Sequence, residues 1–122
     1  MLKIKTIFLV VLLILGARLY AKPKLQQVFL GDFKLENKAV LRNCRIAYRT
    51  FGRMNPGKNN VVLFPTWFGG KTGDAASFLG SGKLVDSSKY FIIVAGAFGN
   101  GESSSPSNSV LQPQEKFPRF TI

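Results

Sequence analysis

A short apolar run that ends at a proline constrains the fold more than any other stretch of this sequence. Residues 61–64 read Val-Val-Leu-Phe; a turn-forming cluster at residues 55–60 precedes them, and Pro65 follows. A continuous apolar run of this length is typical of a strand covered on both faces, as in a parallel sheet. Ligand sites in open α/β sheets lie just beyond the carboxyl ends of such strands. Residues 65–70 are therefore where we expect chemistry.

A second apolar run, residues 90–95, follows after a connection of about 25 residues. Parallel strands need a crossover connection of about this length, so the two runs are expected to be parallel neighbours. We predict a crossover helix around residues 74–79, with Asp74 as its N-cap. Two parallel strands joined by a helix indicate the α/β class.

Upstream of these runs the sequence predicts a hairpin. Residues 27–30 and 33–35 are short strand-like pieces separated by a glycine and an aspartate, and residues 40–51 form the second arm. Apolar and basic residues alternate along that arm with a period of two, which is typical of a half-buried strand. We expect one α/β domain over residues 22–122.

The single cysteine, Cys44, lies within the alternating arm. It is in phase with Ile46 and Tyr48, while Arg45 and Arg49 take the other face. One cysteine cannot form an intrachain disulfide. We expect Cys44 to be a small buried hydrophobe, because a reactive thiol would need a basic partner on its own face.

Residues 1–21 have the layout of a secretory signal peptide. Lys3 and Lys5 precede an apolar run at residues 7–15, and Ala21 offers a cleavage point. The run is shorter than the roughly 20 apolar residues of a membrane-spanning helix. We therefore expect a secreted or periplasmic protein with no stable membrane span. The alternative is a membrane-tethered basic protein that retains this leader.

Composition excludes several classes of function. Seventeen Lys and Arg against six Asp and Glu give a net charge of +11. The basic residues are scattered singly and no nucleic-acid-binding motif accompanies them, so we expect no nucleic-acid partner. With no histidine, the chain cannot form a Ser-His or Cys-His pair. The acids show no metal-ligand or paired-carboxylate spacing, so we expect no metal or cofactor, and solvated or capping roles for Asp74, Asp86, Glu102 and Glu115.

Two short motifs resemble catalytic signatures and fail on inspection. Residues 69–72, Gly-Gly-Lys-Thr, suggest a phosphate loop, but Pro65 stands where the first glycine is needed and has no N–H. Residues 101–105 approach the Gly-x-Ser-x-Gly nucleophile elbow, but the last glycine is missing and Pro106 blocks the helix that should follow. We expect both segments to be loops.

Seven blocks of sequence, in order, carry a family resemblance. From about residue 28 to residue 122 the chain resembles the amino-terminal third of α/β-hydrolase-fold proteins related to homoserine O-acetyltransferase. The blocks are FKLE at 33–36, RIAYRTFG at 45–52, LFPTWFGG at 63–70, GSGKLVD at 80–86, YFII at 90–93, FGNG at 98–101 with SSSPSN at 103–108, and FPRFTI at 117–122. True acetyltransferases usually carry a His-Ala-Leu-Thr-Gly type stretch where this chain has Pro-Thr-Trp-Phe. That variant resembles a hydrolase-like branch.

The resemblance implies a partial α/β-hydrolase fold: the first four strands and the first crossover helix, with the fourth strand between the second and third. It implies acyl transfer or ester hydrolysis on a small-molecule ester or acyl donor. By position, one backbone N–H of the oxyanion hole would come from Trp67, with Phe68 as the neighbouring possibility, while the Trp67 side chain shapes the acyl pocket. Alternatively, both aromatic side chains only cover the end of the sheet.

The family's serine nucleophile, acid and histidine would follow beyond residue 122. We therefore expect the fragment to be inactive alone, as a truncated product or incomplete gene. The alternative is a non-catalytic secreted binding or remnant protein. A downstream frame that encodes a Gly-x-Ser-x-Gly elbow would favour the first interpretation, and an authentic stop the second.

Overall fold

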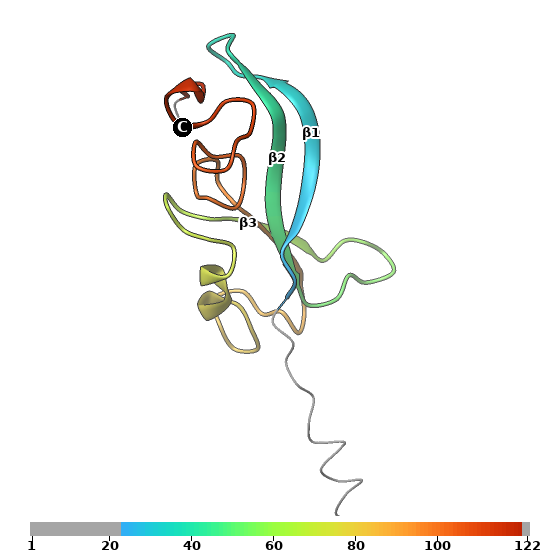
Figure 1. Cartoon of the computed structure of the whole chain (residues 1–122). Coiled ribbons are helices and arrows are strands. Elements are labelled where there is room, and N and C mark those ends of the chain that lie inside the picture. The colour runs from blue at the N-terminus through green and yellow to red at the C-terminus, as the bar shows by residue number, and fades with distance from the viewer. Residues whose placement is uncertain (1–22, 121–122) are drawn as a thin grey trace, which may run out of the picture.

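A long antiparallel hairpin forms one half of the structure (Figure 1). The computed structural model describes residues 23–120, so the predicted signal peptide, residues 1–21, lies outside the described residues. Strand β1 (Gln26–Lys34) pairs with β2 (Val40–Phe51). The bounds of β2 are those the alternation predicts. The two predicted pieces upstream form one strand, because the ladder continues across a register shift at Gly31, whose φ of 70° an L-residue rarely adopts.

The other half of the sheet is parallel. Strand β3 (Val61–Pro65) pairs with β4 (Phe91–Ala95) in parallel, and β4 also pairs with β2, which gives the order β1-β2-β4-β3. Both the predicted parallel pairing and the central place of the fourth strand are confirmed. Strand β4 is continuously apolar because it is central, and its Ile92 and Val94 are fully buried.

The connection between β3 and β4 differs from the prediction. In place of an α-helix it contains one short 3₁₀ helix, η1 (Asp74–Phe78), whose N-cap is Gly73. The Asp74 carboxylate instead accepts a hydrogen bond from the Lys71 N–H at 2.9 Å. Ala75 is the one buried residue of η1, so the segment lacks the apolar stripe that holds a longer helix against a sheet. Within residues 23–120, no helix has the length and apolarity needed to cross a bilayer.

Two small apolar clusters form the core. One joins the crossover to the parallel strands through Ala75, Leu79, Ile92 and Val94. The other joins β2 to the last described residues, with Leu41, Cys44 and Phe117 at its centre and Leu35, Phe98 and Phe120 around it. Cys44 is fully buried, as predicted.

The predicted exposed face of β2 is covered. Arg45 and Arg49 are half-buried rather than solvated, and their side chains bond to other segments. The cover is the loop after β4, which we call the serine loop (residues 96–112) and which lies beside β2 in Figure 1. Sequence alternation could not reveal this loop, because alternation reports the faces of a strand and not what folds onto them.

The serine loop bonds to β2 where β4 no longer reaches. The Ser103 hydroxyl accepts from the Ala47 N–H at 2.9 Å and donates to the Gly96 carbonyl at 2.8 Å. Ser104 pairs with Arg45 twice, through its hydroxyl at 2.9 Å and its backbone N–H at 3.0 Å. Side chains and backbone of the loop thus continue the hydrogen-bond ladder, and a second 3₁₀ helix, η2 (Gln114–Lys116), follows the loop.

Candidate functional site

A tight turn follows β3, at the position that the sequence singled out. The Gly70 N–H donates to the Trp67 carbonyl at 2.9 Å, and Gly69 between them has a φ of 73°. A left-handed residue at the third position of a four-residue turn indicates type II, in which Phe68 occupies the second position. The turn places Trp67 and Phe68 at the carboxyl end of β3.

The turn carries backbone N–H groups that no described residue accepts. Thr66 donates to the Ala95 carbonyl at 2.9 Å and Gly70 donates within the turn. Between them, the N–H groups of residues 67–69 have no acceptor in residues 23–120. Consecutive unbonded donors are what a site for a negatively charged oxygen requires.

The two aromatic side chains of the turn differ in their surroundings. Trp67 is 47% exposed and meets the ring of Phe78 edge to face, with centroids 5.8 Å apart. Phe68 is 89% exposed, so its side chain covers little of the sheet. The Trp67 indole thus forms a wall between the turn and η1, while Phe68 projects outward.

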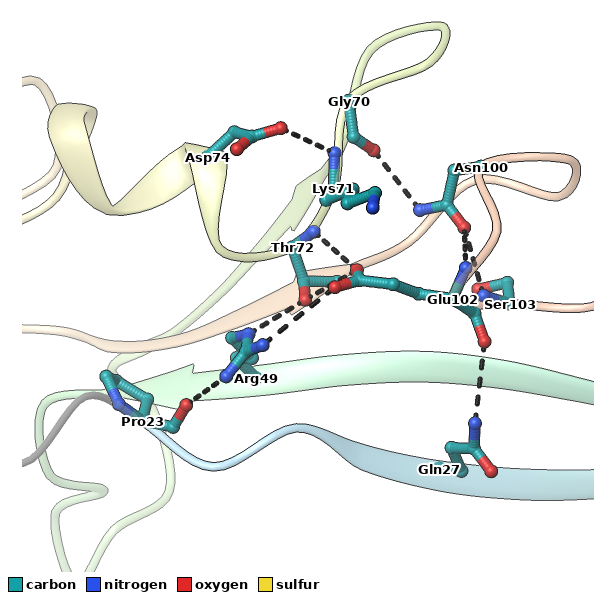
Figure 2. Close-up of polar contacts among 10 residues, drawn as sticks. All are labelled: Pro23, Gln27, Arg49, Gly70, Lys71, Thr72, Asp74, Asn100, Glu102 and Ser103. Carbon is teal, nitrogen blue, oxygen red and sulfur yellow. Dashed lines mark hydrogen bonds and ion pairs between the residues drawn. The ribbon is translucent and has the colours of Figure 1, made fainter.

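A half-buried carboxylate ties the segment after the turn to the loop after β4. Glu102 Oε2 accepts from the Thr72 N–H at 2.7 Å and from the Thr72 hydroxyl at 2.8 Å (Figure 2). Arg49 Nη2 lies 3.9 Å from Glu102 Oε1, and Arg49 Nε donates to Thr72 Oγ1 at 3.0 Å. Arg49 also donates through Nη1 to the Pro23 carbonyl. We call Arg49, Thr72 and Glu102 the Glu102 network.

Asn100 makes a second connection between the same two loops. Its Nδ2 donates to the Gly70 carbonyl at 3.1 Å. Its Oδ1 accepts from the backbone N–H groups of Glu102 at 2.9 Å and Ser103 at 3.0 Å, as Figure 2 shows. One buried amide therefore shapes the start of the serine loop and holds the end of the turn.

The network corrects two sequence expectations. Glu102 was expected to be solvated or to cap a helix, but its side chain is 13% exposed and has three charged or polar contacts. Arg49 was expected on the open face of β2, but its side chain is 22% exposed and paired. The partners are far apart in the sequence, with Thr72 and Glu102 separated by 30 positions, so local spacing carried no signal of them.

The serines of the near-miss elbow are structural. Ser103 and Ser105 are fully buried and Ser104 is 4% exposed. The Ser105 hydroxyl accepts from the Gly101 N–H and donates to the Ser103 carbonyl, so it is committed to the backbone. None of the three hydroxyls is presented to a substrate.

The described part of the chain also offers no reactive thiol and no metal-binding cluster. Burial raises the pKa of the Cys44 thiol, and a hydrogen bond with Ser104 opposes this only in part, so the thiol stays protonated at neutral pH. Over residues 23–120, no group of three metal-ligating side chains lies together. The site as described therefore offers hydrogen-bond donors and an apolar wall.

Comparisons with known proteins find relatives that are named as an esterase and as a homoserine O-acetyltransferase. The chain is 38% identical over 96 residues to a probable esterase of Corynebacterium glutamicum, covering 76% of this chain and 28% of that protein. It is 30% identical over 118 residues to a homoserine O-acetyltransferase of Sulfurimonas autotrophica, covering 77% of this chain and 30% of the enzyme. No family model matches the chain.

A solved structure agrees with these sequence matches. An acetylester hydrolase from Corynebacterium glutamicum superimposes with a TM-score of 0.73 at 36% identity, over 78% of this chain and 28% of that one. The chain thus spans less than a third of the length of the proteins it matches. It is a homologue of the esterases and homoserine O-acetyltransferases of the α/β-hydrolase fold, and its mixed sheet is a part of that fold.

Proposed function

We propose that this chain is the oxyanion-binding part of an exported α/β-hydrolase-fold esterase or acyltransferase. The observation that carries the proposal is the run of unbonded N–H groups at residues 67–69, at the carboxyl end of β3. A solved relative is named an acetylester hydrolase, which favours a small acyl ester as the substrate.

The proposed chemistry is acyl transfer through an acyl-serine intermediate. A serine attacks the ester carbonyl, and the negative charge that develops on the carbonyl oxygen is stabilised by the N–H groups of Trp67 and Phe68. A well-placed donor of this kind contributes about 3–4 kcal/mol to the transition state. The serine and its base would come from the remainder of the protein, because this chain contains no histidine and its buried serines are committed to the backbone.

Export through residues 1–21 is part of the proposal. The layout of a basic start, a short apolar run and Ala21 supports it. Mass spectrometry of the protein recovered outside the cytoplasm should give a chain that begins at Lys22. A chain that begins at Met1 would contradict cleavage and favour a retained leader.

The donor assignment is testable because the turn tolerates a proline at its second position. The chain would be expressed joined to the sequence encoded downstream, and hydrolysis of p-nitrophenyl acetate would be followed. Phe68→Pro removes one N–H, and its control Phe68→Leu keeps it; Trp67→Pro and Trp67→Phe form the second pair.

We expect each proline variant that removes a true donor to lower kcat by roughly 10²- to 10³-fold relative to its control. Full activity in both proline variants would contradict the donor assignment. A downstream sequence without a serine elbow would contradict the proposed chemistry itself.

A further inference from the structure

We propose that Glu102 is a positioning residue for the turn at residues 67–70. It acts through Thr72 and, with Asn100, fixes the segment whose N–H groups remain unbonded. The inference rests on the proposed function for its meaning in catalysis, but the conformational claim concerns this chain alone. According to this proposal, Glu102, which lies more than 30 positions after the turn in the sequence, controls the shape of the oxyanion-binding turn.

The first step is the chemistry of the acceptor. The Glu102 carboxylate takes both the backbone N–H and the hydroxyl of Thr72, at 2.7 and 2.8 Å. Hydrogen bonds to an ionised acceptor are about twice as strong as those between neutral groups. Thr72 is fully buried, so these bonds are not exchanged for bonds to water.

The second step is the counter-charge. A carboxylate that is 13% exposed is costly unless a cation lies beside it. Arg49 provides that cation and also donates to the Thr72 hydroxyl. The hydroxyl is thereby fixed between a donor and an acceptor, which leaves Thr72 one favourable orientation.

The third step is geometry. Thr66 is held to Ala95 at one end of the turn, while Gly70 is held by Asn100 and Thr72 by Glu102 at the other. Only residues 67–69 lie between the fixed points. Because each peptide unit is planar and the span is so short, the positions of the two ends restrict where the intervening N–H groups can point.

The single tryptophan of the chain reports on this geometry. The backbone of Gly70 lies against the Trp67 ring so closely that an added Cβ would come within 2.7 Å of it. A displacement of Gly70 must therefore move the indole, whose fluorescence and accessibility to a quencher will change.

The test compares Glu102→Ala with Glu115→Ala in the full 122-residue chain. Glu115 is an exposed acid in η2, so its replacement removes the same charge away from the turn. Backbone hydrogen exchange at Gly70, Thr72 and Ile92 would be measured together with acrylamide quenching of Trp67. Far-UV circular dichroism would establish that the sheet is retained.

We expect Glu102→Ala to accelerate exchange at Gly70 and Thr72 about tenfold or more, and to increase quenching of Trp67, with Ile92 unchanged. Glu115→Ala should match the unmodified chain. Exchange that accelerates equally at Ile92 would show a role in global stability only and would overturn the proposal, as would unchanged exchange at Gly70 and Thr72.

A second variant covers the case in which Glu102→Ala does not fold. Thr72→Val has the shape of threonine but lacks the hydroxyl that joins Arg49 and Glu102. Thr72→Val should accelerate hydrogen exchange at Gly70 in the same way. Unchanged exchange at Gly70 in this variant would also overturn the proposal. Because no substrate is used, failure here leaves the oxyanion assignment standing, and a failed esterase assay leaves the positioning role standing.

Discussion

Strands β2 and β3 lie on either side of β4, and each has a stretch of backbone edge that β4 does not cover. Residues 40–47 of β2, the bonded edge, exchange hydrogen bonds with the serine loop. The outer side of β3, the open edge, has no strand beside it in residues 23–120, and the side chain of Leu63, which projects from a face of this strand, is 67% exposed. The chain thus completes one edge with polar side chains and leaves the other apolar.

The difference shows which edge this part of the protein can stabilise by itself. Polar side chains on a loop are enough to satisfy the backbone N–H and C=O groups of a strand edge, as Ser103 does for the Ala47 N–H. An exposed apolar strand edge requires another chain segment, and without one it is a site of association. The matched part of this chain covers only 28% of these homologues, which leaves them ample chain to cover such an edge.

The largest expected effect comes from breaking the bonded edge at Ser103. Ser103→Ala leaves the Ala47 N–H and the Gly96 carbonyl buried without a partner and should lower the free energy of unfolding by about 3 kcal/mol. Urea denaturation followed by circular dichroism would measure it. The control, Ser107→Ala, alters an exposed serine in the same loop and should have little effect. Equal stability of both variants would remove the distinction between the edges.

A smaller loss is expected at the far end of the bonded edge. Gln112 accepts from the Arg42 N–H at 2.8 Å and donates to the Val40 carbonyl at 2.9 Å, in a more exposed setting. Water can replace these bonds, so Gln112→Ala should cost only about 1 kcal/mol in the same denaturation experiment. If Gln112→Ala lowered the free energy of unfolding as much as Ser103→Ala, the burial of a hydrogen bond would not determine how much its loss costs.

The pH dependence of Cys44 tests how well the serine loop keeps water from the bonded edge. Burial raises the thiol pKa above its ordinary 9.0, so the folded chain keeps a proton that the unfolded chain releases. This contribution to stability is complete below pH 9 and is lost as the pH rises through the folded pKa. Urea denaturation at pH 7.5 and at pH 10 would measure the free energy of unfolding. Between these two pH values it should decrease more for the unmodified chain than for Cys44→Ala. Identical decreases would indicate a hydrated thiol.

The smallest effect on stability is expected at the open edge. Leu63→Lys places a charge on an exposed position and should change the free energy of unfolding by less than about 0.5 kcal/mol. It should nevertheless reduce self-association, measured by sedimentation velocity, because a lysine opposes edge-to-edge pairing. Leu84→Lys, at a leucine 75% exposed away from β3, is the control. Equal association of the two variants would exclude the open edge as the contact.

Patterns that depend on neighbouring residues predicted much of the fold. The limits of β2 follow from alternation bounded by turn residues, and the parallel pairing of β3 with β4 follows from two apolar runs and the length between them. The order of strands came from family resemblance. The crossover helix was mispredicted because an aspartate before two alanines satisfies a local rule, whereas a helix on a sheet needs a longer apolar stripe.

The candidate site was predicted only in part. The turn after β3 could be located from its proline and glycines, and the assignment of Trp67 and Phe68 as donors stays a prediction. The Glu102 network could not be found in this way, since Arg49, Thr72 and Glu102 lie on three separate segments that only the folded sheet brings together. Charged side chains scattered singly along a sequence look alike whether they are solvated or paired.

The central place of β4 has a consequence for how the protein is made. On a ribosome, β3 is complete before its only described neighbour, because β4 begins 26 residues later, at position 91 rather than 65. At bacterial and eukaryotic elongation speeds this leaves the apolar strand waiting for roughly 1 to 5 s. During that interval the nascent strand is a target for chaperones that recognise extended apolar segments, so synthesis speed through the glycine-rich crossover should influence the yield of folded protein.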